Sequence, residues 1–137
     1  MFTKTVTYKD FDGNERTEVC RFNLSEPEII EMESSYPGGL EQMLKKIIEE
    51  KDQQKILAVF KELILKSYGE KTPDGKRFVK SKELSEALSQ TGAYEQLYMQ
   101  ILRDTDFAIE FTNGIMPERV RQAANQITAD TIVSPVA

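Results

Sequence analysis

The stretch FTKTVTYKDFDGNERTEVCRF, residues 2–22, decides how the chain begins to fold. Residues 2–8 alternate three threonines with apolar or long side chains, and this period of two, rich in β-branched residues, predicts a strand. Residues 16–22 predict a second strand for the same reason. The dipeptide Asp12-Gly13 between them is typical of a tight turn, because glycine adopts a positive φ without steric cost. The stretch therefore predicts a β-hairpin.

The turn also has features of a calcium-binding loop, since Asp10, Asp12 and Asn14 occupy alternate positions. An EF-hand loop that began at Asp10 would need a glycine at its sixth position and a glutamate at its twelfth. Those positions hold Glu15 and Arg21. We therefore expect a hairpin turn here and no metal site.

Short amphipathic helices are predicted after the hairpin. Ser25, followed three residues later by Glu28, forms the sequence of a capping box at the start of the first helix. Further helices are indicated by apolar residues that recur at spacings of three and four, and Asn113-Gly114 is expected to end one of them. The expected helices cover residues 26–34, 40–51, 53–67 and 82–89, and segments within 90–104, 105–114 and 117–127.

These elements predict a helix-dominated α+β fold. We expect one domain over residues 1–127, in which an N-terminal β-hairpin (1–24) is followed by a bundle of about six short helices (25–127). Residues 128–137 show no periodicity and are expected to form a flexible tail. No apolar run approaches the ~20 residues that a membrane helix needs, and the first residues do not resemble a signal peptide. A cytoplasmic location is therefore expected.

The amino-acid composition excludes several classes of function. The chain of 137 residues carries a net charge of −5, which argues against a general nucleic-acid binder. It has no histidine, which excludes histidine-based triads and histidine-ligated zinc. Cys20 is the only cysteine and is interpreted as a small residue in a strand. Because no nucleophile, base and oxyanion donor can be assembled and no nucleotide-binding motif occurs, we expect no catalytic residue, cofactor or metal.

The segment 68–80 interrupts the helices. Pro73-Asp74-Gly75 predicts a turn, and Phe78 and Val79 are expected to pair with residues near Tyr68 in a small hairpin. Basic residues cluster here, and a solvated loop is favoured, with phosphate or nucleic-acid binding as the alternative. The cluster consists of Lys66, Lys71, Lys76, Arg77, Lys80 and Lys82.

Five stretches, in this order, resemble one family of phage proteins: KTVTYKDFDGNERTE, FNLSEPEIIEME, GGLEQMLKKIIEEKD, LKSYGEKTPDGKRFVKS and FTNGIMP. They are similar to tail assembly chaperones of bacteriophages and prophages with long non-contractile tails. The resemblance implies a non-catalytic protein of the host cytoplasm that binds the tape measure protein and keeps it soluble while tail tube subunits polymerise. It also implies that the protein is absent from the mature virion. The major tail tube protein is a further expected partner, and the chain is expected to form a homo-oligomer.

The tape measure protein, as the client of such a chaperone, could bind to exposed apolar helix faces, because an amphipathic helix packs well into an apolar groove. The favoured interpretation of each of these residues is that it forms the core, since a chain of this size needs most of its apolar side chains inside. The alternative function is a structural virion protein that is retained in the particle. The residues considered for partner binding are Leu40, Met43, Leu44, Ile47, Leu57, Phe60, Phe107, Phe111, Ile115 and Met116.

Overall fold

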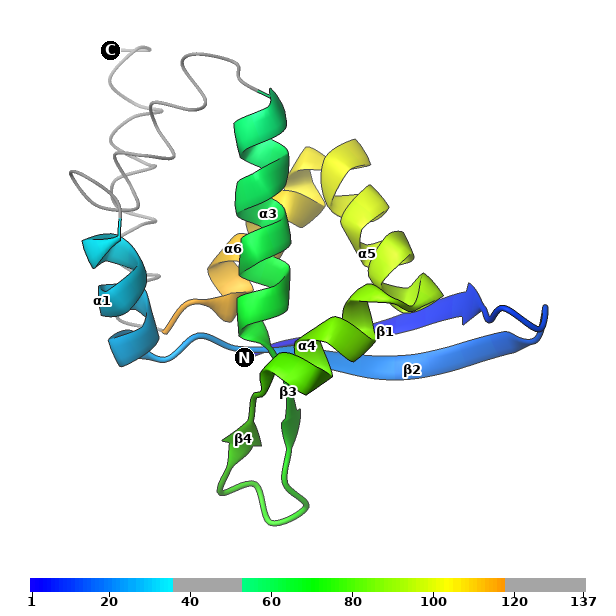
Figure 1. The fold of residues 1–137 in the computed structure, drawn as a ribbon, viewed down its shortest axis with the longest axis horizontal. Helices are drawn as coiled ribbons and strands as arrows, with labels where there is room; N and C mark the ends of the chain where they lie inside the picture. The colour runs from blue at the N-terminus through cyan, green and yellow to red at the C-terminus, as the bar shows by residue number, and fades with distance from the viewer. Residues whose placement is uncertain (36–52, 118–137) are drawn as a thin grey trace.

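The computed structural model describes residues 1–35 and 53–117 (Figure 1). Three expectations therefore lie outside the described residues. They are the helix over 40–51, almost all of the helix over 117–127, and the tail over 128–137.

The predicted β-hairpin is confirmed. Strand β1 (Phe2–Lys9) pairs antiparallel with strand β2 (Glu15–Phe22) along its whole length, from Phe2 opposite Phe22 to Lys9 opposite Glu15. Gly13 adopts a φ of +83° in the connecting turn, as the Asp12-Gly13 signal predicted.

The hairpin is part of a larger sheet than the sequence predicted. Strands β3 (Tyr68–Lys71) and β4 (Phe78–Val79) form the expected small hairpin, and β3 also pairs with the end of β2, so the sheet order is β1-β2-β3-β4. The junction is short, since only Phe22–Tyr68 and Arg21–Gly69 are paired. The β3–β4 hairpin projects on the side of β1–β2 opposite to the helices (Figure 1).

The described residues contain five helices, where about six were expected for the bundle. The cap predicted at Ser25 is confirmed, because its side chain accepts a hydrogen bond from a backbone N–H in the first turn of the helix that follows. Ser81, Thr91 and Asp104 cap three later helices in the same way. The helices are α1 (Glu26–Ser34), α3 (Gln53–Ser67), α4 (Lys82–Ser89), α5 (Gly92–Arg103) and α6 (Thr105–Ile115).

The predicted end of the last of these helices at Asn113-Gly114 is wrong, because α6 continues to Ile115. Gly114 serves packing instead of a helix stop. A β-carbon at this position would lie 2.7 Å from Cδ2 of Phe2, closer than van der Waals contact permits. The absence of a side chain at Gly114 therefore allows α6 to approach β1.

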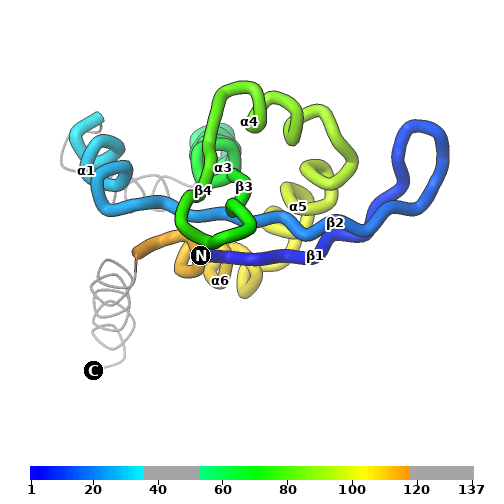
Figure 2. The backbone as a smooth tube through the Cα atoms, turned by 90° about the horizontal axis from the view of Figure 1, so that it is seen from below, coloured from blue at the N-terminus to red at the C-terminus, as the bar shows by residue number. Residues whose placement is uncertain are grey.

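The core lies between the helices and one face of the β1–β2 hairpin (Figures 1 and 2). Aromatic rings meet at its centre: the ring centroid of Phe111 lies 5.3 Å from that of Phe2 and 5.5 Å from that of Phe22, both close to edge-on. Such edge-to-face pairs contribute about 0.5–1.5 kcal/mol beyond the burial of their area. The opposite face of the hairpin is exposed and carries Thr3, Thr5, Thr7, Thr17 and Val19.

Candidate functional site

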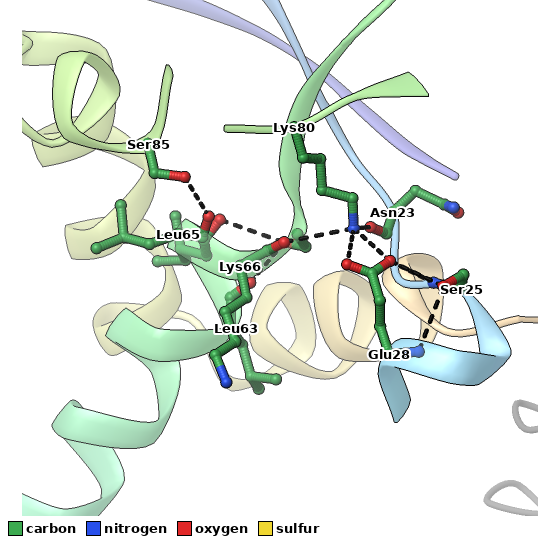
Figure 3. A network of polar contacts seen from close by, with 10 residues as sticks. Asn23, Ser25, Glu28, Leu63, Leu65, Lys66, Lys80 and Ser85 are labelled. Atoms are coloured by element: carbon green, nitrogen blue, oxygen red, sulfur yellow. Dashed lines mark hydrogen bonds and ion pairs between the residues drawn. The ribbon is translucent and has the colours of Figure 1, made fainter. Parts of the chain in front are cut away.

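A polar junction joins four segments of the chain (Figure 3). The ammonium of Lys80, just after β4, donates hydrogen bonds to both carboxylate oxygens of Glu28 at 2.6 and 2.7 Å. It also donates to the carbonyl of Asn23 at 2.6 Å and, more weakly, to that of Lys66 at 3.4 Å. These contacts engage the N–H donors of the ammonium. Lys80 therefore connects α1, α3 and the sheet.

Glu28 also completes the capping box of α1. Its carboxylate accepts from the backbone N–H and the hydroxyl of Ser25, both at 2.9 Å, while the Ser25 hydroxyl accepts from the Glu28 backbone N–H at 3.3 Å. Partial burial acts to raise the pKa of the Glu28 carboxyl, but the hydrogen bonds from Lys80 and Ser25 outweigh it and hold that pKa below its ordinary value. Glu28 is therefore ionised at neutral pH, and its hydrogen bonds to Ser25 and Lys80 fix the orientation of α1.

The basic cluster of the sequence is divided by the fold. Lys80 is bound to Glu28, Lys66 lies 2.9 Å from Glu62, and Lys82 lies 3.8 Å from Glu86. The remaining three basic residues, on and beside the β3–β4 turn, have no ion-pair partner within residues 1–35 and 53–117. They are Lys71, Lys76 and Arg77, all of them exposed.

The turn that carries these basic residues is ordered by Asp74. Its carboxylate accepts a hydrogen bond from the Thr72 hydroxyl at 2.6 Å and one from the backbone N–H of Lys76 at 3.0 Å. These hydrogen bonds lower the pKa of Asp74. The Asp74 carboxylate is therefore hydrogen-bonded within the turn. The β3–β4 tip, which carries Lys71, Lys76 and Arg77, presents mainly positive charge on a protein whose net charge is −5.

Four of the residues predicted for partner binding are core residues in this structure. Phe107, Phe111, Ile115 and Met116 are all buried, with at most 8 % of any side chain exposed. Their contact with a partner stays a prediction, and it would require α6 to move. The predicted residues Leu40, Met43, Leu44 and Ile47 lie outside the described residues.

Helix α3 offers apolar side chains that are only partly covered. Leu57 and Phe60, both predicted for partner binding, are half-buried, as is Ile56. Phe60 follows Ile56 by four positions and Leu57 by three, so the three residues lie on one side of the helix. We call these residues (Ile56, Leu57 and Phe60) the α3 strip. Leu57 and Phe60 are therefore the predicted partner-binding residues, among those that the structure describes, that are accessible without unfolding.

Other apolar residues are exposed that the sequence analysis did not select. Phe11, in the turn between β1 and β2, is 91 % exposed, Ile30 on α1 is 61 % exposed and Ile109 on α6 is 55 % exposed. A large apolar residue inside a polar turn sequence is a signal that could have identified Phe11, because nothing in such a turn requires an aromatic ring. Ile30 and Ile109 could be found only once the buried side of each helix was known.

The two tyrosines one helical turn apart on α5 contact each other. The rings of Tyr94 and Tyr98 are stacked, with centroids 5.7 Å apart, and both residues are half-buried.

Residues 1–35 and 53–117 contain no group of three or more side chains suited to hold a metal ion. In the same part of the chain, no helix is long and apolar enough to cross a membrane.

Together these features define a helix-dominated α+β protein with partly covered apolar residues on α3 and a basic turn between β3 and β4. The chain belongs to the phage tail assembly chaperone family, whose model matches residues 1–134. No curated protein and no solved structure matches it. The family indicates a role in tail assembly and partners among phage tail proteins.

Proposed function

We propose that this chaperone binds the tape measure protein and keeps it soluble while the tail tube polymerises around it. The role is non-catalytic, takes place in the host cytoplasm, and ends when the chaperone leaves before the virion is complete. The observation that carries the proposal is the family match over residues 1–134. A long helical client with exposed apolar faces needs such protection, because large exposed apolar patches cause aggregation.

The α3 strip is the proposed contact surface within the described residues. Ile56 and Phe60 pack against the core with one side and remain partly accessible with the other. An amphipathic client helix laid along α3 would cover the strip by helix-against-helix packing. Burial of apolar area at about 25 cal/mol per Å² would stabilise that contact.

The net charge of −5 supports the same role. Several chaperone copies bound along one client would repel each other and neighbouring complexes, and this repulsion favours solubility. The basic β3–β4 tip with Lys71, Lys76 and Arg77 is an exception to that charge and is suited to an acidic segment of a tail protein.

Co-expression of the tape measure protein with the chaperone tests the proposal. We expect the tape measure protein in the soluble fraction with the wild-type chaperone and in the pellet with none. Leu57→Ser with Phe60→Ser should reduce the soluble amount several-fold, whereas Thr5→Ser with Thr7→Ser, on the exposed sheet face, should leave it unchanged. Equal solubility of the client with and without chaperone would contradict the proposed function.

Mass spectrometry of purified particles distinguishes the alternative. A chaperone that leaves should be abundant in the lysate of infected cells and absent from mature particles. Stoichiometric retention in the particle would instead assign the protein to the structural components of the tail.

A further inference from the structure

Three residue pairs in the chain place glycine directly after an aspartate or an asparagine. They are Asp12-Gly13, Asp74-Gly75 and Asn113-Gly114. At such a pair the backbone nitrogen of the glycine can attack the side-chain carbonyl carbon of the residue before it, because glycine has no side chain to hinder the approach. The five-membered succinimide ring that results reopens mainly to isoaspartate. Which of the three pairs reacts therefore depends on how the fold holds each one.

The two Asp-Gly pairs occupy closely matched hairpin turns at separate ends of the molecule (Figure 1). The Gly13 N–H donates to the Asp10 carbonyl at 3.0 Å, and the Gly75 N–H donates to the Thr72 carbonyl at 2.9 Å. The two glycines have φ angles of +83° and +76°. No atom lies within 4 Å of the position that a β-carbon would take at either glycine, and the aspartate of each pair is exposed. The two backbones therefore offer ring closure the same conditions.

The two aspartate side chains differ in their hydrogen bonds. Oδ1 of Asp74 accepts from the Thr72 hydroxyl at 2.6 Å and from the Lys76 backbone N–H at 3.0 Å. These bonds favour the ionised carboxylate and lower its pKa, whereas ring closure needs the neutral acid, whose hydroxyl can leave as water. The Asp12 side chain forms no hydrogen bond and no ion pair with residues 1–35 and 53–117. It can therefore turn toward the Gly13 nitrogen without losing a contact.

Asn113-Gly114 is the pair that should react fastest in an unfolded chain, because a side-chain amide reacts without first gaining a proton. In the folded chain both residues lie inside α6. A helical N–H donates to the carbonyl four residues earlier, so the Gly114 nitrogen is held away from the Asn113 side chain. A β-carbon at Gly114 would lie 2.7 Å from Cδ2 of Phe2, which leaves little room beside the pair. Helix α6 would therefore have to open before the ring could close.

We propose that Asp12 is a site of spontaneous isomerisation to isoaspartate, and that the fold protects Asp74 and Asn113 from the same chemistry. First, the Gly13 nitrogen forms a bond to the side-chain carboxyl carbon of Asp12. The carbon–hydroxyl bond breaks, and the amide hydrogen leaves with the hydroxyl as water. Water then adds to the other ring carbonyl, which is the former main-chain carbonyl of Asp12, and the bond from that carbon to the Gly13 nitrogen breaks. The side chain of Asp12 now carries the main chain, and water is the only other reactant.

Isomerisation would lengthen the main chain of the β1–β2 turn by one carbon. The unmodified turn is closed by the Asp10 N–H, which donates to the Asn14 carbonyl at 2.8 Å. It is also closed by the Asp10 carboxylate, which accepts from the N–H groups of Asp12 and Asn14 at 3.0 and 2.9 Å. An extra carbon between Asp12 and Gly13 displaces Asn14 from both contacts. Modified chains should therefore lose the closed turn at the end of the hairpin, and this inference does not depend on the proposed tape measure client.

Storage of the folded full chain at mildly acidic pH, followed by tryptic peptide mapping, tests the proposal. Trypsin places Asp12 and Asp74 in separate peptides, residues 10–16 and 72–76, and electron-transfer fragmentation distinguishes isoaspartate from aspartate. Isoaspartate should form at Asp12 about tenfold faster than at Asp74, or more, because hydrogen bonds to a charged group must be released first at Asp74. In guanidinium chloride the two rates should become similar, and Asn113 should react fastest.

Two variants test the reason for the difference. Thr72→Val removes the hydroxyl that binds Asp74 and should raise the rate at Asp74 several-fold, while the rate at Asp12 stays unchanged. The control Thr5→Val makes the same chemical change on the exposed sheet face and should change neither rate. Circular dichroism establishes that each variant is folded.

The folded wild type decides the outcome even if a variant fails to fold. Equal rates at Asp12 and Asp74, or isoaspartate that appears first at Asp74 or Asn113, would overturn the proposal. The same holds if Asp12 stays unmodified in the folded chain while it reacts in guanidinium chloride. An Asp74 rate that Thr72→Val leaves unchanged would overturn the explanation of its protection.

Discussion

Lys80 and Glu28 are separated by 52 residues in the chain, and the Lys80 ammonium lies 2.6 Å from a Glu28 carboxylate oxygen. The side chains are 21 % and 37 % exposed, so the pair is neither fully solvated nor fully buried. The same ammonium binds the carbonyl of Asn23, where the chain leaves β2 for α1. The pair therefore fixes the direction in which α1 leaves the sheet.

Glu28→Gln should destabilise the fold by about 1–2 kcal/mol, because it removes a partly screened ion pair and leaves the ammonium with weaker acceptors. Glutamine retains the acceptor that the Ser25 N–H needs in the capping box, so the change isolates the interaction with Lys80. Urea unfolding monitored by circular dichroism gives the difference in free energy.

The matched control is Glu86→Gln. Its pair with Lys82 is longer, at 3.8 Å, and both side chains are largely exposed. We expect no measurable change in the unfolding free energy there. An equal loss in the two variants would show that the Lys80–Glu28 contact has no special role.

The junction should also make stability depend on pH. The pKa of Glu28 is lower in the folded protein than its ordinary value, so its ion pair stabilises the fold above that ordinary value and loses this effect as the pH falls through the folded pKa. The difference in melting temperature between wild type and Glu28→Gln should therefore shrink as the pH is lowered from neutral to values below 4.5, the ordinary pKa of the carboxyl. A difference that stays constant over this range would contradict the assignment.

Gly114→Ala should destabilise the protein by roughly 1–3 kcal/mol, although alanine is the better helix former. The added methyl group would meet Cδ2 of Phe2 at 2.7 Å. The test is a double-mutant cycle with Phe2→Leu, since the smaller side chain leaves room for the methyl group. Gly114→Ala should be less harmful in that background, and additive effects would refute the packing explanation.

Cys20 should react slowly with thiol reagents in the folded protein. It is 4 % exposed, and its burial, together with the nearby charge of Glu18, raises the pKa of the thiol. Labelling with an aromatic disulfide should be at least tenfold slower for the native protein than for the protein in urea. A native rate equal to the denatured rate would show that the strand opens readily.

Local sequence predicted the elements well where the deciding interactions span few residues. The β1–β2 hairpin was confirmed because its turn and its alternation are contained within residues 2–22. The start of α1 was confirmed because Ser25 and Glu28 cap it within one helical turn. The small β3–β4 hairpin was confirmed for the same reason, with Asp74 binding its own turn.

The candidate surfaces were less predictable, since exposure depends on what packs against a residue. Phe60 and Phe111 both occupy apolar stripes, yet Phe60 is half-buried and Phe111 is wholly buried against Phe2 and Phe22. The basic residues Lys76 and Lys80 are four positions apart, yet only Lys80 finds a carboxylate, on a helix 52 residues away.

The sequence by itself determined where the strands and most of the described helices begin and end, because turn, cap and periodicity signals act between near neighbours. The tertiary structure alone decided that β3 joins β2, that α6 runs past Gly114 to pack on Phe2, and that Phe11 remains in solvent. These features arise from contacts between residues far apart in the chain, and such contacts form only when the elements pack together.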